Sequence, residues 1–162
     1  MSNVLSLVKA IQKIAGEPPC KKTMQKMVYL LQEAHVDLGF DYSIHFYGPY
    51  SAELDSEIRY LSDCGQLNMD ITEYGHMLSA NDSTDIPSTD ENAHNIISYF
   101  GSKTPSQLEL LATTLYVQRE ISNTVSEDII NGVKKIKGTK YSSTQIDQAI
   151  HELEGQSYFT LQ

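Results

Sequence analysis

The first part of the chain carries two stripes of apolar side chains at helical spacing. Apolar positions recur every three or four residues over 4–15 and over 22–38, which predicts two amphipathic helices. Gly16 closes the first stripe, and the Pro-Pro pair that follows is expected to break the chain between the helices. Gly39 stands where the second helix is expected to end.

The hydrophobic period then changes from helical to alternating. From Phe40 as far as Tyr47, apolar and polar residues alternate, which predicts a strand with one buried face. In this pattern Ile44 and Phe46 face the core, whereas His45 and Tyr47 face outward. We expect the Gly-Pro pair that follows to end the strand.

A third helix and a hairpin are predicted next. Ser51 is a suitable N-cap for a helix over 52–64. Two extended stretches, 67–71 and 76–79, flank a Glu-Tyr-Gly turn, which predicts a β-hairpin. The order helix, helix, strand, helix, hairpin is that of a winged helix, in which the hairpin is the wing.

The remainder of the chain predicts further helices after an acidic loop at 81–91. The helices are expected over 93–100, 105–120, 127–137 and 144–154, with a last short strand over 157–161. We therefore predict an α+β fold that is mostly α, a winged-helix-like helical domain with a small β-hairpin. A single domain is expected over 1–162, with a winged-helix-like half at 1–80, the acidic loop at 81–91 and a C-terminal helical half at 92–162.

Composition narrows the class of protein. The chain has 162 residues, of which 40% are hydrophobic and 20% charged, as is ordinary for one globular domain. No apolar stretch approaches the roughly 20 residues of a membrane span, and the first residues lack the cleavage site of a signal peptide. Two cysteines are too few for a disulfide framework. We expect a cytoplasmic protein with reduced thiols and no membrane contact.

Charge is unevenly distributed along the chain. The net charge is −9, and residues 41–100 contain a single basic residue among eleven acidic ones. Such a region repels phosphate, so we expect no nucleic-acid partner. The residues that could still contact phosphate are Lys21, Lys22, Lys26 and Arg59. For the three lysines, a solvated helix face is the more ordinary interpretation.

The sequence contains no recognisable set of catalytic residues. The five histidines have no metal-binding spacing, and there is no phosphate-binding loop, dinucleotide fingerprint or nucleophile elbow. We therefore expect no catalytic residues, no metal ion and no cofactor.

The segment from Ser43 to Ser51 is the best candidate for recognition of a partner. Tyrosines on a rigid turn bury much area at little entropic cost. The alternative, that Tyr47 and Tyr50 pack on neighbouring helices with bonded hydroxyl groups, stays open. The candidate partner-binding residues are Gln25, Lys26, Tyr29, His45, Tyr47, Gly48, Pro49 and Tyr50.

Two short motifs resemble a known family. Residues 24–31, MQKMVYLL, resemble the "LQKLVYLL" helix of the YwgA-like family of small bacterial and archaeal proteins, and residues 47–51, YGPYS, match the turn that follows it there. Residues 108–113 and 141–153 also resemble that family. A more distant resemblance is to the Panacea domain of SocA-like antitoxins, which has a similar helix and a Gly-Pro turn, and which implies an antitoxin role.

We therefore predict a protein-interaction module without enzymatic activity. It is antitoxin-like or defence-associated and binds a protein partner, either a toxin or a neighbouring defence protein. The alternative is a winged-helix DNA-binding transcriptional regulator, although helix 52–64 offers only Arg59 for phosphate and helix 144–154 contains no Lys or Arg. An enzyme has the least support from the residues, and a homodimer is compatible with them.

Overall fold

The computed structural model describes residues 3–80 and 90–162, and within them it contains seven helices and two antiparallel hairpins. The helices are α1 (Asn3–Ala15), α2 (Lys21–Glu33), α3 (Ala52–Asp63), α4 (Glu91–Phe100), α5 (Pro105–Ile121), α6 (Ser126–Lys137) and α7 (Ser143–Gly155). The strands are β1 (Ser43–His45), β2 (Gly48–Tyr50), β3 (Leu67–Thr72) and β4 (Gly75–Ala80). The predicted α+β, mostly helical class is confirmed, and most of the predicted acidic loop lies outside the described residues.

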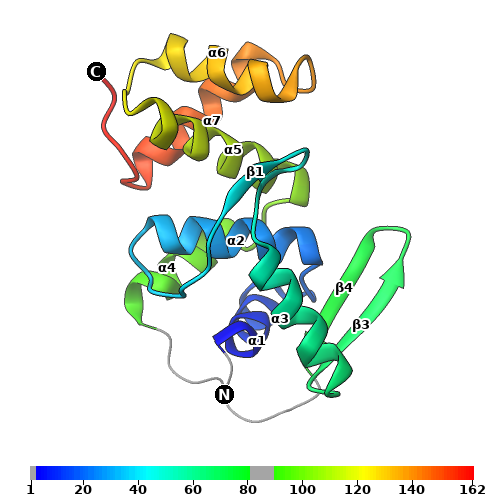
Figure 1. Ribbon diagram of the computed structural model, residues 1–162. Helices are drawn as coiled ribbons and strands as arrows, with labels where there is room; N and C mark the ends of the chain where they lie inside the picture. The colour runs from blue at the N-terminus through cyan, green and yellow to red at the C-terminus, as the bar shows by residue number, and fades with distance from the viewer. Residues whose placement is uncertain (1–2, 81–89) are drawn as a thin grey trace.

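Helix α5 is the element on which the two halves of the chain meet. In Figure 1, α1 to α4 lie on one side of it and α6 with α7 on the other, while the β1–β2 hairpin reaches up from the lower group toward α5. The buried apolar side chains form one hydrophobic cluster that takes residues from every helix. A core continuous across α5 fixes the position of the hairpin relative to both groups.

Capping residues account for most of the helix boundaries. Ser51 accepts a hydrogen bond from the backbone N–H of Leu54, as predicted for the N-cap of α3. Thr104 and Gln107 form a complete capping box at the start of α5. None of the described helices has the length and apolar content needed to cross a membrane.

The second helix ends five residues before the predicted boundary. It stops at Glu33, and His35 adopts a left-handed conformation with φ of 69°. Gln32 then accepts a hydrogen bond from Phe40 N–H and donates one to its carbonyl oxygen, both at 2.8 Å. The helical period continued toward Gly39, but this clamp requires the chain to reverse earlier.

The prediction of a single strand with a buried face was wrong. Ser43 pairs with Tyr50 and His45 with Gly48, so the Gly-Pro pair begins a returning strand instead of ending one. Ile44 is 36% exposed and Phe46 is 84% exposed. The hairpin packs on α2 and α5 through β2, while Ile44 of β1 and Phe46 at the tip stay exposed, so the alternating pattern here does not mark a buried face.

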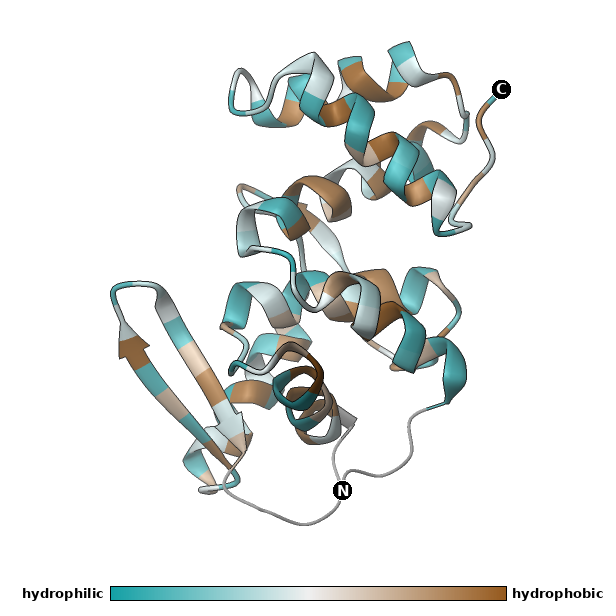
Figure 2. Cartoon of the chain, turned by 180° about the vertical axis from the view of Figure 1, so that it is seen from behind, coloured by the Kyte–Doolittle hydropathy of each residue, from teal (hydrophilic) through white to brown (hydrophobic). Residues whose placement is uncertain are grey.

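The β3–β4 hairpin is confirmed, whereas the predicted last strand is absent from the described structure. Figure 2 shows β3–β4 extending away from the helices, and Ile71 and Tyr74 near its end are exposed. In place of a strand, residues 157–161 form an irregular tail, where Tyr158 donates a hydrogen bond to the carbonyl oxygen of Leu30. The winged-helix arrangement remains a prediction.

Candidate functional site

The β1–β2 hairpin is held to α2 by a buried glutamine. Gln25 donates a hydrogen bond to the carbonyl oxygen of Ser51 at 2.9 Å and accepts one from Ser51 N–H at 2.8 Å. One amide side chain thus satisfies both backbone groups of the residue that links β2 to α3. The segments MQKM and YGPYS, which carry the family resemblance in the sequence, are therefore in direct contact in the structure.

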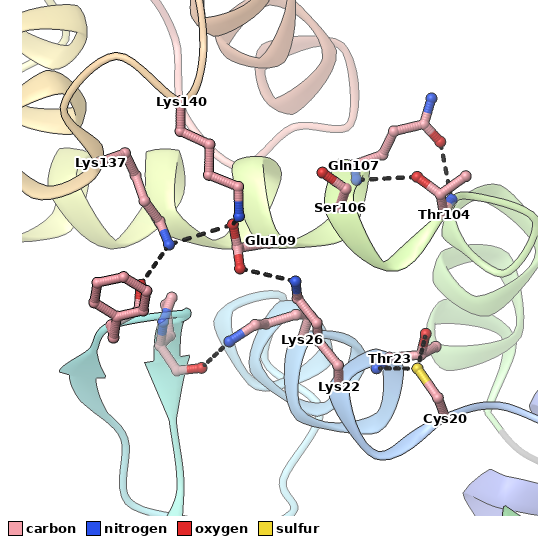
Figure 3. Close-up of polar contacts among 12 residues, drawn as sticks. Cys20, Lys22, Thr23, Lys26, Thr104, Ser106, Gln107, Glu109, Lys137 and Lys140 are labelled. Atoms are coloured by element: carbon pink, nitrogen blue, oxygen red, sulfur yellow. Dashed lines mark hydrogen bonds and ion pairs between the residues drawn. The ribbon is translucent and has the colours of Figure 1, made fainter. Parts of the chain in front are cut away.

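Lys26 provides a second connection between α2 and the hairpin. Its side chain is only 2% exposed, and Nζ donates a hydrogen bond to the carbonyl oxygen of Pro49 at 2.6 Å (Figure 3). Burial lowers the pKa of Lys26 to about 8, although the charge of Glu109 opposes this shift. The interpretation of Lys26 as part of a solvated helix face is therefore wrong.

Glu109 on α5 is the centre of a group of cations. Its fully buried carboxylate lies 2.9 Å from Nζ of Lys22 and 3.3 Å from Nζ of Lys137, and it also pairs with Lys140 (Figure 3). The hydroxyl group of Tyr141 donates a hydrogen bond to Oε2 at 2.7 Å. One carboxylate thus joins α2, α5 and the segment that follows α6.

This environment keeps Glu109 ionised. Burial alone would raise the pKa, but the hydrogen bonds from Lys140, Tyr141 and Lys22 outweigh it and lower the pKa of Glu109 to about 2. The carboxylate has no exposed surface, so it can orient the surrounding lysines but cannot itself contact a large ligand.

The closing glycine of the hairpin lies directly against α5. Gly48 has φ of 92°, and a Cβ atom added to it would lie 2.5 Å from Thr113 Oγ1. That hydroxyl oxygen is buried without a hydrogen-bond partner among the residues that the structure describes. Glycine therefore satisfies two separate requirements here, the left-handed conformation and the close approach to a neighbouring helix.

The tip of the hairpin presents two aromatic rings to solvent. Phe46 is 84% exposed and Tyr47 is 60% exposed, and their rings meet edge to face with centroids 5.1 Å apart. Lys137 donates a hydrogen bond to the carbonyl oxygen of Phe46 at 2.8 Å, which ties the tip to the end of α6. The aromatic side chains of the tip are therefore exposed, while its backbone is held in place by Lys137.

A cleft of about 430 Å³ opens beside this tip. It is lined by Lys21, Lys22, Gln25, Lys26, Tyr47, Tyr50, Asp55, Arg59 and His76. Asp55 on α3 lies 2.8 Å from both Lys21 Nζ and Arg59 Nη2, and Lys22 Nζ lies 5.5 Å from the centre of the Tyr47 ring. We call Lys21, Lys22, Lys26, Arg59, Lys137 and Lys140 the cationic cluster; its carboxylates are Asp55 and Glu109.

The structure divides the predicted partner-binding residues into two groups. Surface positions are held by His45, Tyr47 and, in part, Tyr50, whereas Gln25, Lys26, Tyr29, Gly48 and Pro49 lie beneath the surface. The buried group positions the hairpin and has little surface with which to contact a partner. All four candidate phosphate-binding residues line the cleft, namely Lys21, Lys22, Lys26 and Arg59.

Several residues of this site were missed at the level of sequence. Lys137 and Lys140 lie far along the chain from the hairpin, and Phe46 was assigned to the core. Glu109 left a signal, because it is a carboxylate inside the apolar run LELLA of a predicted helix. A charge at such a position is rarely buried without a partner, so it indicated a cationic neighbour.

The described residues form no group of three or more His, Cys, Asp or Glu side chains able to hold a metal ion. The groups that line the cleft are amines, a guanidinium group, phenols, one imidazole, one amide and the carboxylate of Asp55, which is paired with Lys21 and Arg59. These groups suit the binding of anions and aromatic rings.

Comparison with known proteins gives two relatives, and no family model matches the chain. The chain is 27% identical to Bacillus subtilis YwgA, a protein named as uncharacterized, in an alignment of length 153 that covers 86% of this chain and 88% of YwgA. This similarity supports a YwgA-like family. The resemblance to the Panacea domain stays a prediction.

The second relative is an enzyme. The chain is 33% identical to the DNA ADP-ribosyl glycohydrolase of Thermus aquaticus in an alignment of length 115 that covers 64% of this chain. The match covers 32% of the length of that enzyme. This similarity contradicts our expectation of a protein without enzymatic activity, because it places an enzyme among the proteins most like this chain. The sequence contains no recognisable catalytic motif that could have indicated this similarity to an enzyme.

Proposed function

We propose that this protein is a protein-interaction module, antitoxin-like or defence-associated, that binds its partner through the tip of the β1–β2 hairpin. The observation that carries the proposal is the pair of exposed aromatic rings on a turn fixed from both sides. Lys26 holds β2 from α2, and Lys137 holds the carbonyl oxygen of Phe46 from α6. Rigid aromatic side chains lose little entropy on binding, which makes them effective anchors in protein interfaces.

The second relative supports a role beside chemistry on DNA. The match to the DNA ADP-ribosyl glycohydrolase covers about a third of that enzyme, so the shared region is one part of a larger protein. A glycohydrolase of this kind requires a preceding reaction that attaches ADP-ribose to DNA. A protein that performs this transfer must bind DNA through a basic surface. Acidic residues of 41–100 away from the cationic cluster, such as Asp70 and Glu73 on the β3–β4 hairpin, are complementary in charge to that surface, while the aromatic tip contacts another part of the same partner. We therefore propose a DNA-modifying protein as the partner.

The test is capture of the partner from the native host with tagged protein at low salt, with and without nuclease. The variant Phe46→Ala removes an anchor, and Ile71→Ala is its control because Ile71 is an equally exposed apolar side chain on the other hairpin. We expect a stoichiometric, nuclease-resistant partner that is lost with Phe46→Ala and retained with Ile71→Ala.

Two outcomes would contradict the proposal. Equal capture by wild type and Phe46→Ala would show that the tip is not the interface, and loss of every captured protein on nuclease treatment would show that nucleic acid bridges them. Incubation of the isolated chain with an ADP-ribosylated oligonucleotide belongs to the same experiment. Release of ADP-ribose there would assign the activity of the relative to the chain itself.

A winged-helix DNA-binding regulator has less support from the geometry. The wing, β3–β4, contains no Lys or Arg but includes Asp70 and Glu73, and α3 offers Arg59 beside Asp55. A wing of this composition repels the backbone of duplex DNA. Retention of duplex DNA at low salt that is lost with Arg59→Gln would favour this alternative.

A further inference from the structure

We propose that the cleft beside the hairpin binds a single nucleotide unit, with its phosphate on the cationic cluster and its base on Tyr47. This inference goes beyond the proposed interaction with a protein partner and rests on the geometry of the cleft alone. Nucleotide units occur free in solution and in single-stranded nucleic acid, and the two sources share this chemistry.

The cluster has an excess of positive charge after its internal ion pairs are counted. The six cations of the cluster and its two carboxylates together carry a charge of +4, in a chain whose net charge is −9. Asp55 and Glu109 hold these cations in fixed positions without neutralising them. At physiological salt, charges beyond about 8 Å are largely screened, so a bound phosphate responds mainly to the cluster and not to the distant acidic residues.

The cations at the mouth of the cleft can be reached by a ligand. The side chain of Arg59 is 69% exposed, and those of Lys21 and Lys22 are partly exposed and line the same cleft. Lys26 is buried at the floor and contributes its charge without a direct contact. A guanidinium group with flanking ammonium groups is a typical arrangement for phosphate recognition.

The aromatic residues indicate an unpaired base. Tyr47 and Tyr50 line the same cleft as the cations, and His45 lies with its ring 4.8 Å from that of Tyr50. Bases in a duplex are already stacked on one another, whereas free or single-stranded bases stack on exposed aromatic rings. The volume of about 430 Å³ falls within the range of about 300–1,000 Å³ typical of small-molecule sites.

The test is direct binding by the full chain in 50 mM salt, measured by calorimetry with ADP and by fluorescence anisotropy with a labelled 12-mer of single-stranded DNA. The same 12-mer annealed to its complement is the duplex arm. We expect saturable binding of ADP or of the single strand that is stronger than binding of the duplex. With about three phosphate contacts, affinity for the single strand should fall about twenty-fold between 50 and 200 mM salt.

Two pairs of variants locate the site. Arg59→Gln and Tyr47→Ala should each weaken binding at least about fivefold. Their controls, Lys13→Gln and Tyr74→Ala, remove a cation and an aromatic ring at exposed positions outside the cleft and should leave binding unchanged. All four positions are exposed, and circular dichroism checks that each variant is folded.

The proposal is overturned if neither ADP nor the single strand binds in 50 mM salt, if duplex DNA binds as well as the single strand, or if the cleft variants bind like their controls. Binding of ADP without the single strand supports a free nucleotide as the ligand, and the reverse result supports nucleic acid. Phe46 does not line the cleft, so the capture experiment with Phe46→Ala can fail or succeed independently.

Discussion

Glu109 shows how one residue can set the properties of a whole site. Its carboxylate is fully buried, yet three lysines and the hydroxyl group of Tyr141 compensate it. A buried charge is tolerated only when it is paired and hydrogen-bonded, so removal of the carboxylate leaves uncompensated ammonium groups inside the protein. The carboxylate of Glu109 therefore both stabilises the site and holds its positively charged side chains in place.

Substitution Glu109→Gln should destabilise the protein strongly at pH 7. We expect a loss of about 3–5 kcal/mol in the free energy of unfolding, because one partner of a buried ion pair is removed. Urea titration followed by circular dichroism measures it. Arg119→Gln is a suitable comparison, since its pair with Glu33 is partly exposed, and it should lose less. Equal losses in the two variants would contradict the central role of Glu109.

The same carboxylate predicts a dependence of stability on pH. The pKa of Glu109 is about 2 in the folded protein, below the value of 4.5 expected when it is unfolded. Its contribution is therefore complete above about pH 4.5 and is lost as pH falls toward 2. The difference in unfolding free energy between wild type and Glu109→Gln should narrow from pH 7 to pH 3. A difference that stays constant over this range would contradict the assignment.

Comparison of Gly48 with Gly39 separates two effects of replacing a glycine by alanine, namely backbone strain and steric clash. Both have positive φ, but an added Cβ meets Thr113 only at Gly48 and meets nothing within 4 Å at Gly39. Gly39→Ala should lower the free energy of unfolding by about 1 kcal/mol through backbone strain alone. Gly48→Ala adds a steric clash and should lower it by at least about 2 kcal/mol. Chemical denaturation of both variants measures the difference, and similar losses would show that α5 moves aside.

At the scale of elements, the position of the β1–β2 hairpin is set mainly by α2. Lys26 binds the backbone of β2 at Pro49 and Gln25 binds that of Ser51, the residue after β2, so the hairpin and the start of α3 move with that helix. A two-stranded hairpin is marginal on its own, and these contacts supply the support that a larger sheet would give. The MQKM and YGPYS segments act as one structural unit.

Substitution Gln25→Leu should disrupt this unit. The change leaves the N–H group of Ser51 buried without a partner, which costs about 1–3 kcal/mol. The carbonyl oxygen of Ser51 loses one of its two hydrogen bonds and keeps the one from Asp55 N–H. Gln32→Leu is a matched control, because Gln32 makes the same pair of bonds to Phe40 at a half-buried position where water can replace them. Urea denaturation should show a larger loss for Gln25→Leu, and the reverse order would contradict the proposed role of the clamp.

Local signals predicted most helices but not the details of the hairpin. Periodicity and capping residues indicate helices from short stretches of sequence, and Ser51 and Thr104 cap α3 and α5 as expected. The alternation over 40–46 is also real, but which face is covered depends on elements distant in sequence. For the same reason the end of α2, fixed by the contact between Gln32 and Phe40, was placed too late.

The site was predictable only in part. Lys21, Lys22, Lys26 and Arg59 were recognised as a possible phosphate-binding group, and they do line one cleft. Their neighbours Lys137 and Lys140 come from a different half of the chain, and only the docking of that half on α5 brings them close. The spacing of residues along the sequence carries no information about contacts between elements that are far apart in the chain.

At the scale of the whole molecule, the two halves share one core and are joined by polar contacts. Tyr158 donates a hydrogen bond to the carbonyl oxygen of Leu30, and Arg119 pairs with Glu33 while donating to the carbonyl oxygen of Tyr158. The end of α2, α5 and the C-terminal tail therefore meet at one place. We expect the halves to unfold together.

Substitution Tyr158→Phe tests this coupling. Loss of the buried hydrogen bond should lower the free energy of unfolding by about 1–2 kcal/mol without splitting the transition. Helix content by circular dichroism and tyrosine fluorescence should change at the same urea concentration. The chain contains ten tyrosines and no tryptophan, so the fluorescence reports on both halves. Separate transitions would show that the halves fold independently.

The cations around Glu109 also make the distribution of charge over the molecule uneven. Half of the twelve basic residues lie in the cluster, and subtracting its charge of +4 from the net −9 leaves −13 on the rest of the chain. Positive charge is therefore concentrated beside the aromatic tip in a chain that is negative elsewhere, so the field around the molecule is uneven. An anionic body is drawn toward the cleft during its approach, at a rate that falls with added salt.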